Sequence, residues 1–291
     1  TNDKAVVLNY RVYIGSMTMI SINTNYGGIF AAKASSQSQQ VIDEAMHRLS
    51  TGKRINNARD DSAGLAIAVR LTAQVEALAV ASRNAADAQS MLDTAEGSMT
   101  EIHTLLLRMR ELAVQSANGT LTDNDRDHTD AEFQQLEAEI TRISDNTKWA
   151  GKALINGSAT SLSFQVGENA SQTISVTIAD MAASATGLAL DDDDLQTAAS
   201  AQTAISALDT AIATVSTERG KLGAVSNRLT STMANLDNIS INLSASKGRI
   251  EDADFAAETG SLAKGQILQQ AAMAMLAQAN ASKQQILTLI Q

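Results

Sequence analysis

Apolar residues recur at every seventh position between residues 201 and 250. The positions are Ala201, Leu208, Val215, Leu222, Leu229, Leu236, Leu243 and Ile250. A period of seven keeps one face of a long helix against a partner helix, because 3.5 residues per turn hold the same seam in contact. The sequence therefore predicts one long helix whose apolar face needs a second helix to cover it.

The first half of the chain contains a matching stripe. Its positions are Leu71, Leu78, Ala85, Leu92, Met99, Leu106 and Ala113, with companions at Ala81, Ala88, Ala95, Ile102 and Met109. At 1.5 Å per residue, two such helices would be roughly 60 to 75 Å long. We predict a mainly α fold, in which the N- and C-terminal halves form a coiled-coil rod in antiparallel or parallel orientation. The expected packing residues are Leu71, Leu78, Leu92, Met99, Leu106, Leu208, Val215, Leu222, Leu229, Leu236 and Leu243.

The composition agrees with long helices and argues against several functional classes. Aromatic residues make up 3% of the chain, and proline and cysteine are absent. Disulfides and thiolate metal sites are therefore excluded. The net charge of −10 disfavours nucleic acid and anionic membranes as partners. No apolar run approaches the roughly 20 residues needed to span a bilayer, so we expect no membrane insertion.

Local signals divide the chain into six segments. Thr122 and Asp125 form a capping-box pattern that opens a helix after a stop at Asn118 and Gly119. Alternating residues from Leu162 to Ile178 predict a small β-hairpin at the centre of the chain, preceded by a loop from residue 149 to 157. The expected segments are an extension (1–18), an N-terminal helix (19–61), rod helices (62–157), the hairpin and its connecting loop (158–194), a C-terminal rod helix (195–250) and a last helix (251–291).

The two terminal helices carry apolar faces that neither can bury alone. The residues we expect on these faces are Ile29, Met46, Leu49, Leu268, Met275, Leu276, Ile286 and Leu287. Adhesive surfaces of this kind are typical of chains that self-associate. The sequence therefore predicts assembly of many copies through the two ends of the chain.

Catalytic and metal-binding patterns are not evident. His47, His103 and His128 are scattered, and neither a zinc-protease motif nor a nucleophile triad surrounds them. Four aspartates at 191–194 lack the spacing of a calcium loop, and we interpret them as acidic residues that favour the start of the next helix. We predict a protein that is not an enzyme and carries no cofactor.

Several separated motifs resemble bacterial flagellins, in the order in which that family has them. They are INTN at 22–25, LSTGKRINNARDDSAGLAIA at 49–68, RMRELAVQSANGTLTDNDR at 108–126, EFQQLEAEITRI at 132–143 and SKGRIEDADFAAE at 246–258. The resemblance covers about 270 residues, from Met19 to Gln291. It identifies a short type of flagellin, because only residues 179–199 stand where many members insert large outer domains.

The resemblance implies a structural subunit that polymerises into the flagellar filament for swimming motility. In that family the terminal helices form the inner tube and fold on assembly, while the coiled-coil rod surrounds them. It also implies an extracellular location, export without a cleaved signal peptide, and three kinds of partner. These are other flagellin subunits, an export chaperone that holds the last helix around residues 266–290, and filament cap or junction proteins.

The family resemblance further singles out Arg108, Leu112 and Glu132. The matching residues of enteric-type flagellins contact an innate-immune toll-like receptor, so these three are candidates for the same contact. The residues alone are equally compatible with a solvated arginine, a rod-face leucine and an exposed glutamate.

Two other functions use the same architecture. A flagellar hook-filament junction protein shares the terminal helices but caps a filament instead of extending it. A cell-surface adhesin or glycan-binding flagellin homologue would need exposed aromatic residues near the hairpin, where Phe164 is the only one we identify.

Overall fold

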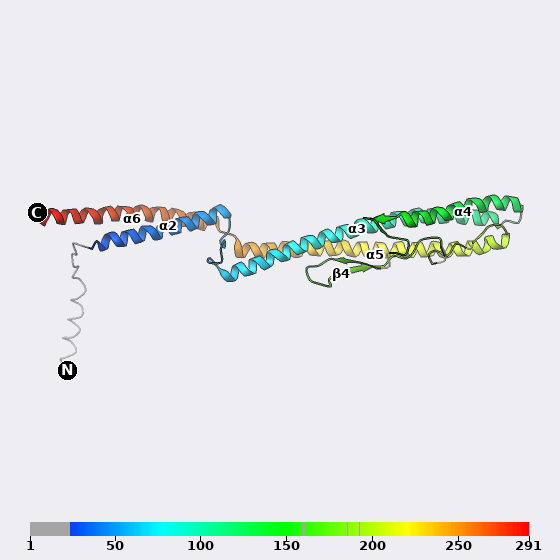
Figure 1. Ribbon diagram of the computed structural model, residues 1–291, viewed down its shortest axis with the longest axis horizontal. Coiled ribbons are helices and arrows are strands. Elements are labelled where there is room, and N and C mark those ends of the chain that lie inside the picture. Colours follow the sequence, from blue (N-terminus) through cyan, green and yellow to red (C-terminus); the bar gives the residue numbers. More distant parts are fainter. Residues whose placement is uncertain (1–23, 159–160, 185, 192, 291) are drawn as a thin grey trace, which may run out of the picture. The chain divides into compact units, whose positions relative to one another are not determined.

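The computed structural model describes residues 24–158, 161–184, 186–191 and 193–290, with side chains described up to residue 284 (Figure 1). The predicted extension, 1–18, lies outside this range. The helices are α2 (Tyr26–Thr51), α3 (Ser62–Ser116), α4 (Asp123–Asn146), α5 (Ala198–Glu251) and α6 (Phe255–Ile290). The strands are β1 (Lys148–Trp149), β2 (Lys152–Ala153), β3 (Leu162–Gln165) and β4 (Thr173–Val176). The prediction of a mainly α fold with a small hairpin is confirmed.

The chain divides into two compact units. The first, which we call the terminal unit, combines residues up to Ala68 with those from Lys247 onward. The second, the central unit, runs from Val69 to Ser246. The boundaries fall inside α3 and α5, a few residues from the divisions at 61/62 and 250/251 that local sequence signals suggest.

Helices α3 and α5 pack antiparallel in the central unit. Arg110 Nε donates to Asp209 Oδ1 at 2.7 Å. Further back along α3, Glu96 Oε1 accepts from Arg219 Nε at 2.9 Å. The contact residue on α5 changes from Asp209 to Arg219 while that on α3 changes from Arg110 to Glu96. Because one number rises as the other falls, the two helices run in opposite directions. The structure thereby decides between the two orientations that the heptad pattern allows.

The core of the central unit follows the two stripes of period seven. On α3 and α5 the structure buries all of the expected packing residues except Leu243, which is half-buried: Leu71, Leu78, Leu92, Met99, Leu106, Leu208, Val215, Leu222, Leu229 and Leu236. Alanines such as Ala85, Ala95 and Ala113 fill the positions between them at 0% exposure. Small residues at these points allow the two helices to approach closely.

Helix α4 covers a second face of α3. Its start has the expected capping box, in which Thr122 and Asp125 satisfy each other's backbone N–H groups. The hydroxyl of Thr122 lowers the pKa of the Asp125 carboxyl, and the backbone N–H of the same residue adds to this effect. Phe133 and Ile140 are fully buried on the inner face of α4. The nearly buried Arg126 donates to the carbonyl oxygens of Ser116 and Asn118, both at 3.0 Å, and so closes the end of α3.

The strands form two small antiparallel pairs. β3 pairs with β4 in the register Leu162–Val176 and Phe164–Ile174, inside the span predicted for the hairpin. The expectation of a loop at 149–157 is wrong, because β1 and β2 pair there through a two-residue turn. Ala150 and Gly151 in this turn have φ values of 49° and 83°. Two positive φ angles match the twist of a tight hairpin, but strands of two residues show no alternation from which to predict them.

The segment after β4 packs onto the central unit and leads to α5. Met181, Leu190 and Leu195 are fully buried there. Leu195 is held at its backbone by Asp130, whose Oδ1 accepts from the N–H at 2.8 Å, and by Ser116, whose hydroxyl donates to the carbonyl at 2.6 Å. The interpretation of the aspartate run as the start of a helix is wrong, because α5 begins at Ala198 and has no acidic residue in its first turn.

Helix α3 also meets a simple criterion for crossing a membrane. An 18-residue window within Ser62–Ser116 has a mean hydropathy of 1.5, so by length and composition alone this helix could cross a membrane. The expectation that no apolar run is long enough to span a bilayer is therefore corrected. Core helices of globular proteins pass the same test. Only 22% of this window is buried within the structure, so packing in the core of the central unit does not by itself account for its apolar character.

Candidate assembly surface

Helices α2 and α6 form an antiparallel pair that makes up most of the terminal unit. Arg48 Nη1 contacts Glu258 Oε1 at 2.9 Å near one end of the pair. Gln269 Nε2 donates to Gln39 Oε1 at 2.6 Å, and Asn25 Nδ2 donates to Asn280 Oδ1 at 3.1 Å toward the other end. These polar contacts fix the register of two helices that come from opposite ends of the sequence.

Small residues line the seam between α2 and α6. The buried positions of α2 are Gly28, Ala31, Ser38, Ile42 and Ala45, and Ala272 is buried on α6. A Cβ atom added at Gly265 would lie 2.8 Å from Cγ1 of Ile42. Gly265 therefore marks a point where the two helices approach too closely for a larger side chain. The seam excludes water over a narrow strip and leaves the larger apolar side chains outside it.

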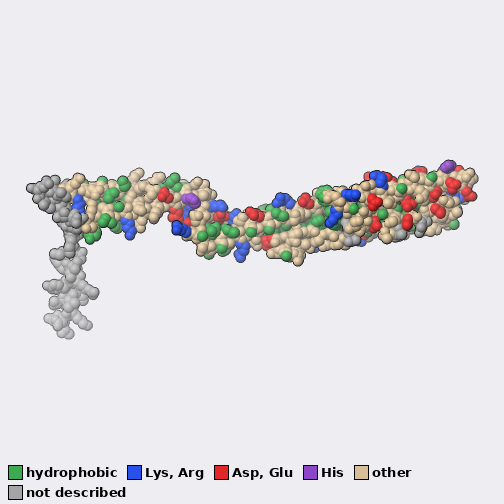
Figure 2. Space-filling view, in the orientation of Figure 1, with side chains coloured by type: hydrophobic (Ala, Val, Ile, Leu, Met, Phe, Trp, Pro, Cys, Tyr) green, Lys and Arg blue, Asp and Glu red, His purple; other side chains and the backbone are tan. Residues whose placement is uncertain are grey.

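Large hydrophobic side chains lie exposed on the outward faces of the pair, where Figure 2 shows hydrophobic atoms among polar ones. Phe30 is 68% exposed on α2, and Ile267 is 66% exposed on α6. Among the side chains that the structure describes on these two helices, the exposed large hydrophobic residues are Tyr26, Ile29, Phe30, Val41, Met46, Phe255, Ile267, Leu268, Met273 and Met275. We call this set the apolar face of the terminal unit.

A groove of about 600 Å³ runs along part of this face. Phe30 and Val41 of α2 and Leu268 and Met275 of α6 border it, with small residues between them. Its lining is mainly apolar, and Lys264 is the one charged residue among the groups that the structure describes there. A surface of this kind fits the apolar side chains of another protein chain.

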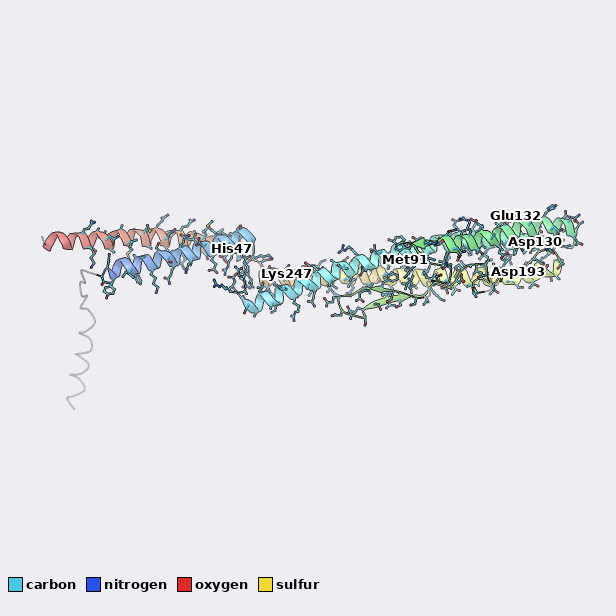
Figure 3. All side chains as sticks on the ribbon, in the orientation of Figure 1. His47, Met91, Asp130, Glu132, Asp193 and Lys247 are labelled. Atoms are coloured by element: carbon cyan, nitrogen blue, oxygen red, sulfur yellow. The ribbon has the colours of Figure 1, made fainter. Side chains whose placement is uncertain are left out.

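Ionic and backbone contacts hold the turn that follows α2. Gly52 adopts φ 71° and donates its N–H to Arg48, which ends the helix in a left-handed cap. Glu251 pairs with Lys53 at 2.5 Å, and its carbonyl accepts from the N–H of Arg54 at 2.6 Å. The N–H groups of Asn56 and Asn57 lower the pKa of Asp60 by donating to its carboxylate. Figure 3 shows Lys247 on α5 and His47 on α2, both in this unit.

The residues predicted for the terminal faces lie mostly on the surface of the pair. Ile29, Met46, Leu268 and Met275 are exposed, whereas Leu49 and Leu276 are half-buried. Ile286 and Leu287 belong to α6, but their side chains lie outside the described residues. Sequence reasoning missed Ala31 and Ile42, which help to make the seam. The spacing of the buried residues of α2 is compatible with one face of a helix, but Ala and Ser contribute weakly to a hydrophobic pattern.

The three candidate receptor residues are placed differently from one another. Arg108 on α3 donates through Nε and Nη2 to Glu132 Oε1 of α4, at 3.0 and 2.8 Å, and this hydrogen bond raises the pKa of Arg108. Both residues are exposed, and Figure 3 shows Glu132 on the outer side of α4. Leu112 is 2% exposed and belongs to the core. The expectation of a leucine available for direct contact is therefore wrong, because α4 covers that side of α3.

The acidic residues near α4 do not form a metal centre among the described residues. Figure 3 shows Asp130 and Asp193. Both carboxylates act electrostatically on the half-buried Glu137. Burial raises the pKa of Glu137, and the negative charges of Asp191, Asp193 and Asp130 raise it further. Within the described ranges, no group of three or more His, Cys, Asp or Glu side chains has the arrangement needed to hold a metal ion.

The fold and the apolar face together define a class of helical structural proteins that associate with other protein chains. The model of the bacterial flagellin N-terminal helical region matches residues 22–160, and that of the C-terminal helical region matches residues 205–290. A flagellin from Halalkalibacterium halodurans is 44% identical over 247 residues, which cover 85% of this chain and 91% of that protein. A flagellin from Bacillus subtilis is 39% identical over 92% of this chain and 99% of that protein. The chain therefore belongs to the bacterial flagellin family and is a structural subunit of the flagellar filament, an extracellular part of the flagellum.

Solved structures include similar folds. The Bacillus cereus flagellin is 34% identical over 53% of this chain and 88% of that chain, with a TM-score of 0.48. A putative flagellar hook-associated protein from Vibrio parahaemolyticus has a TM-score of 0.57 over 66% of this chain and all of that chain. Its 17% identity shows a shared fold only.

Proposed function

We propose that copies of this chain polymerise through the apolar face of the terminal unit. The observation that carries the proposal is the contrast within the α2–α6 pair, where mainly small residues fill the seam and ten of the described large hydrophobic side chains remain exposed. Full burial of one such side chain contributes about 1.5–3 kcal/mol. Neighbouring subunits that cover several of them supply a large driving force for assembly.

The same contrast supports coupling between assembly and folding of the terminal helices. A seam of Ala, Ser and Gly, with Ile42 as the one large aliphatic residue buried on α2, encloses little apolar area, so the pair gains little stability from its own packing. Contact with neighbouring copies adds the missing burial and orders the two helices further. In this proposal the central unit folds in the isolated chain, and the terminal unit reaches its full stability only in the filament.

Substitution of Phe30 tests the proposal directly. Phe30→Asp introduces a charge on the apolar face without removing a seam residue, so we expect the critical concentration for polymerisation to rise by more than about tenfold. Phe30→Leu keeps the position apolar and serves as the matched control. Light scattering measures assembly, negative-stain microscopy measures polymer length, and circular dichroism checks the helix content of each monomer. Unchanged polymerisation of a folded Phe30→Asp protein would refute the proposed surface.

We further propose that the exposed side of α6 binds an export chaperone before assembly. The supporting feature is the group Ile267, Leu268, Met273 and Met275, which a partner can shield in the monomer. Export without a cleaved signal peptide, and contacts with cap or junction proteins at the filament end, belong to the same proposal. Co-purification of a chaperone with the full chain, and its loss when residues 252–291 are deleted, would support chaperone binding at α6.

Recognition by an innate-immune toll-like receptor is a separate proposal that now concerns Arg108 and Glu132. The supporting feature is their exposed ion pair beside a groove of about 450 Å³, with Leu112 at its floor. Arg108→Ala and Glu132→Ala should reduce receptor signalling by monomeric protein. Arg142→Ala, which breaks a comparable exposed pair with Glu139, should leave it unchanged. Equal signalling by all of these proteins would remove the proposal.

A further inference from the structure

A second groove lies in the central unit, between α3, the β1–β2 hairpin and β3. Its volume is about 570 Å³, within the range of small-molecule sites. Buried side chains of Ala88, Met91 and Leu162 form the floor, and Figure 3 shows Met91 on α3. Trp149 and Phe164 form apolar walls. The groove is therefore an aromatic-lined site, and it shares no residue with the apolar face used for the proposed assembly.

The positive-φ turn at Ala150 and Gly151 holds Trp149 at the edge of this groove. Trp149 is 37% exposed, so part of its ring is accessible to a ligand in the groove. It is the single tryptophan in a chain with 3% aromatic residues. Phe164 of β3 lines the same groove and is half-buried. The structure thus brings together two of the few aromatic residues, which are 15 positions apart in sequence.

The rim of the groove presents polar groups of complementary kinds. Asp87 of α3 offers carboxylate acceptors, and Lys152 of β2 offers ammonium donors. Both side chains are exposed, and neither has a hydrogen bond or an ion pair with another described residue. Asn84 adds an amide, of which Nδ2 donates to the carbonyl oxygen of Gln165 at 3.2 Å and the oxygen remains available as an acceptor.

We propose that this groove binds a neutral oligosaccharide. A pyranose ring has an apolar C–H face that can lie against an aromatic ring and a periphery of hydroxyl groups that donate and accept hydrogen bonds. Trp149 supplies the surface for the C–H face, while Asp87 accepts from hydroxyls and Lys152 donates to them. A neutral sugar avoids repulsion by the net charge of −10 and by Asp87 itself.

An extended peptide is a poorer match to the same groove. The edge of β3 could in principle receive another strand, as exposed sheet edges do. The N–H of Val166 donates to the carbonyl oxygen of Gln172 in the hairpin. Because backbone groups of successive residues point to opposite sides of a strand, those of Ser163 and Gln165 point to the free edge of β3. Asn84 already occupies the carbonyl of Gln165 on that edge, and β3 is only four residues long. Little of the edge therefore remains for strand pairing.

The single tryptophan makes the proposal directly measurable. Soluble full-length chain is titrated with neutral cello-, manno-, xylo-, malto- and chitooligosaccharides, and the emission of Trp149 is followed. We expect a saturable change in emission with at least one of these series. Asp87→Ala and Lys152→Ala keep the reporter and should weaken binding by about tenfold, the effect of losing a hydrogen-bonding partner. Lys148→Ala, on β1 but outside the groove, is the matched control and should bind as the parent does.

The outcomes separate this inference from the proposed function. No saturable emission change with any of these oligosaccharides at millimolar concentration would overturn it. Equal binding by the Asp87→Ala and parent proteins would also overturn it, as would a saturable response only to an extended peptide. Circular dichroism confirms that each variant keeps its helix content. Polymerisation of the Phe30 variants, measured in parallel, tests the assembly surface separately. The oligosaccharide site and the assembly surface can therefore be refuted independently of each other.

Discussion

The two units of this flagellin bury different kinds of residue, and the difference explains what each unit can do alone. The central unit encloses large side chains, including Phe133, Met99 and Leu106, at 0% exposure. The seam of the α2–α6 pair encloses mainly Ala, Ser and Gly, and the large hydrophobic side chains of those two helices face outward. The central unit therefore has its own core, whereas the terminal unit leaves large hydrophobic side chains exposed, and these form the surface that we propose for assembly.

The comparison teaches that helix length and apolar content do not by themselves indicate where stability lies. Both units contain long apolar helices, but only α3, α4 and α5 converge on a shared core with the strand segments. Substitutions in each unit test this difference. The emission of Trp149 reports on the central unit, and hydrogen exchange of α2 and α6 reports on the terminal unit.

Phe133→Ala should have the largest effect. Removal of a fully buried aromatic ring leaves a cavity between α4 and the rest of the core, and such changes cost about 3–5 kcal/mol. Urea unfolding followed by Trp149 emission measures the loss. Leu107→Ala, at an exposed position of α3, should cost less than about 1 kcal/mol and is the control. Similar losses for both variants would mean that the central unit lacks the core described above.

Ile42→Ala should destabilise the terminal unit alone. Ile42 is the one large aliphatic residue buried in the α2 part of the seam, and its loss should cost about 2 kcal/mol, at the low end for such truncations because the seam is narrow. We expect faster hydrogen exchange in α2 and α6 with an unchanged urea midpoint for Trp149 emission. A matching drop in the stability of the central unit would show that the two units unfold together.

Gly265→Ala and Gly260→Ala form a matched pair on α6. Alanine in a helix is favoured over glycine by about 1 kcal/mol, so Gly260→Ala, with open space around it, should slow hydrogen exchange in α6. At Gly265 the new methyl group would meet Ile42 at 2.8 Å and push the helices apart, which should cancel or reverse that gain. Equal stabilisation by both substitutions would argue against close packing at Gly265.

Glu137→Gln should produce the smallest effect, with a defined dependence on pH. Because the folded-state pKa of Glu137 is raised, its ionised form disfavours folding above that pKa, and the penalty disappears below the ordinary glutamate pKa of about 4.3. The substitution should stabilise the central unit at pH 7 by less than about 1 kcal/mol, since Glu137 is partly solvated, and the gain should vanish in acid. Urea unfolding at several pH values measures this gain.

Glu139→Gln should have the opposite sign. The hydrogen bond from Arg142 lowers the pKa of Glu139, so its ionised form favours folding. The contribution is present above the ordinary pKa of glutamate and is lost as the pH falls through the lowered value. A gain in stability at neutral pH for this variant would contradict the assigned roles of the two glutamates.

Patterns that repeat along the sequence predicted the main features of the fold. The period of seven located α3 and α5 and the side chains buried between them, and Thr122 with Asp125 located the start of α4. Each feature depends on residues close together in sequence, whose spacing decides which side of a helix they share. The sequence pattern was also sufficient for the hairpin of β3 and β4, because alternation is visible over four residues.

The candidate sites could be predicted only in part. Leu112 belongs to α3, but its burial depends on α4, which folds back over it after a turn of several residues. Trp149 lies in a stretch without alternation, and its place beside Phe164 depends on the turn at Ala150 and Gly151. Neither relation follows from the identities of neighbouring residues.

By itself the sequence determined that two long helices must share an apolar seam, since side-chain spacing along one helix is a local property. It also determined that the two chain ends carry apolar surface in excess of what they can cover. The tertiary structure decided that α3 and α5 run antiparallel, that mainly small residues meet between α2 and α6, and that Trp149 borders a groove. These outcomes depend on which distant segments come together, and the close approach of two backbones selects the smallest side chains for the contact.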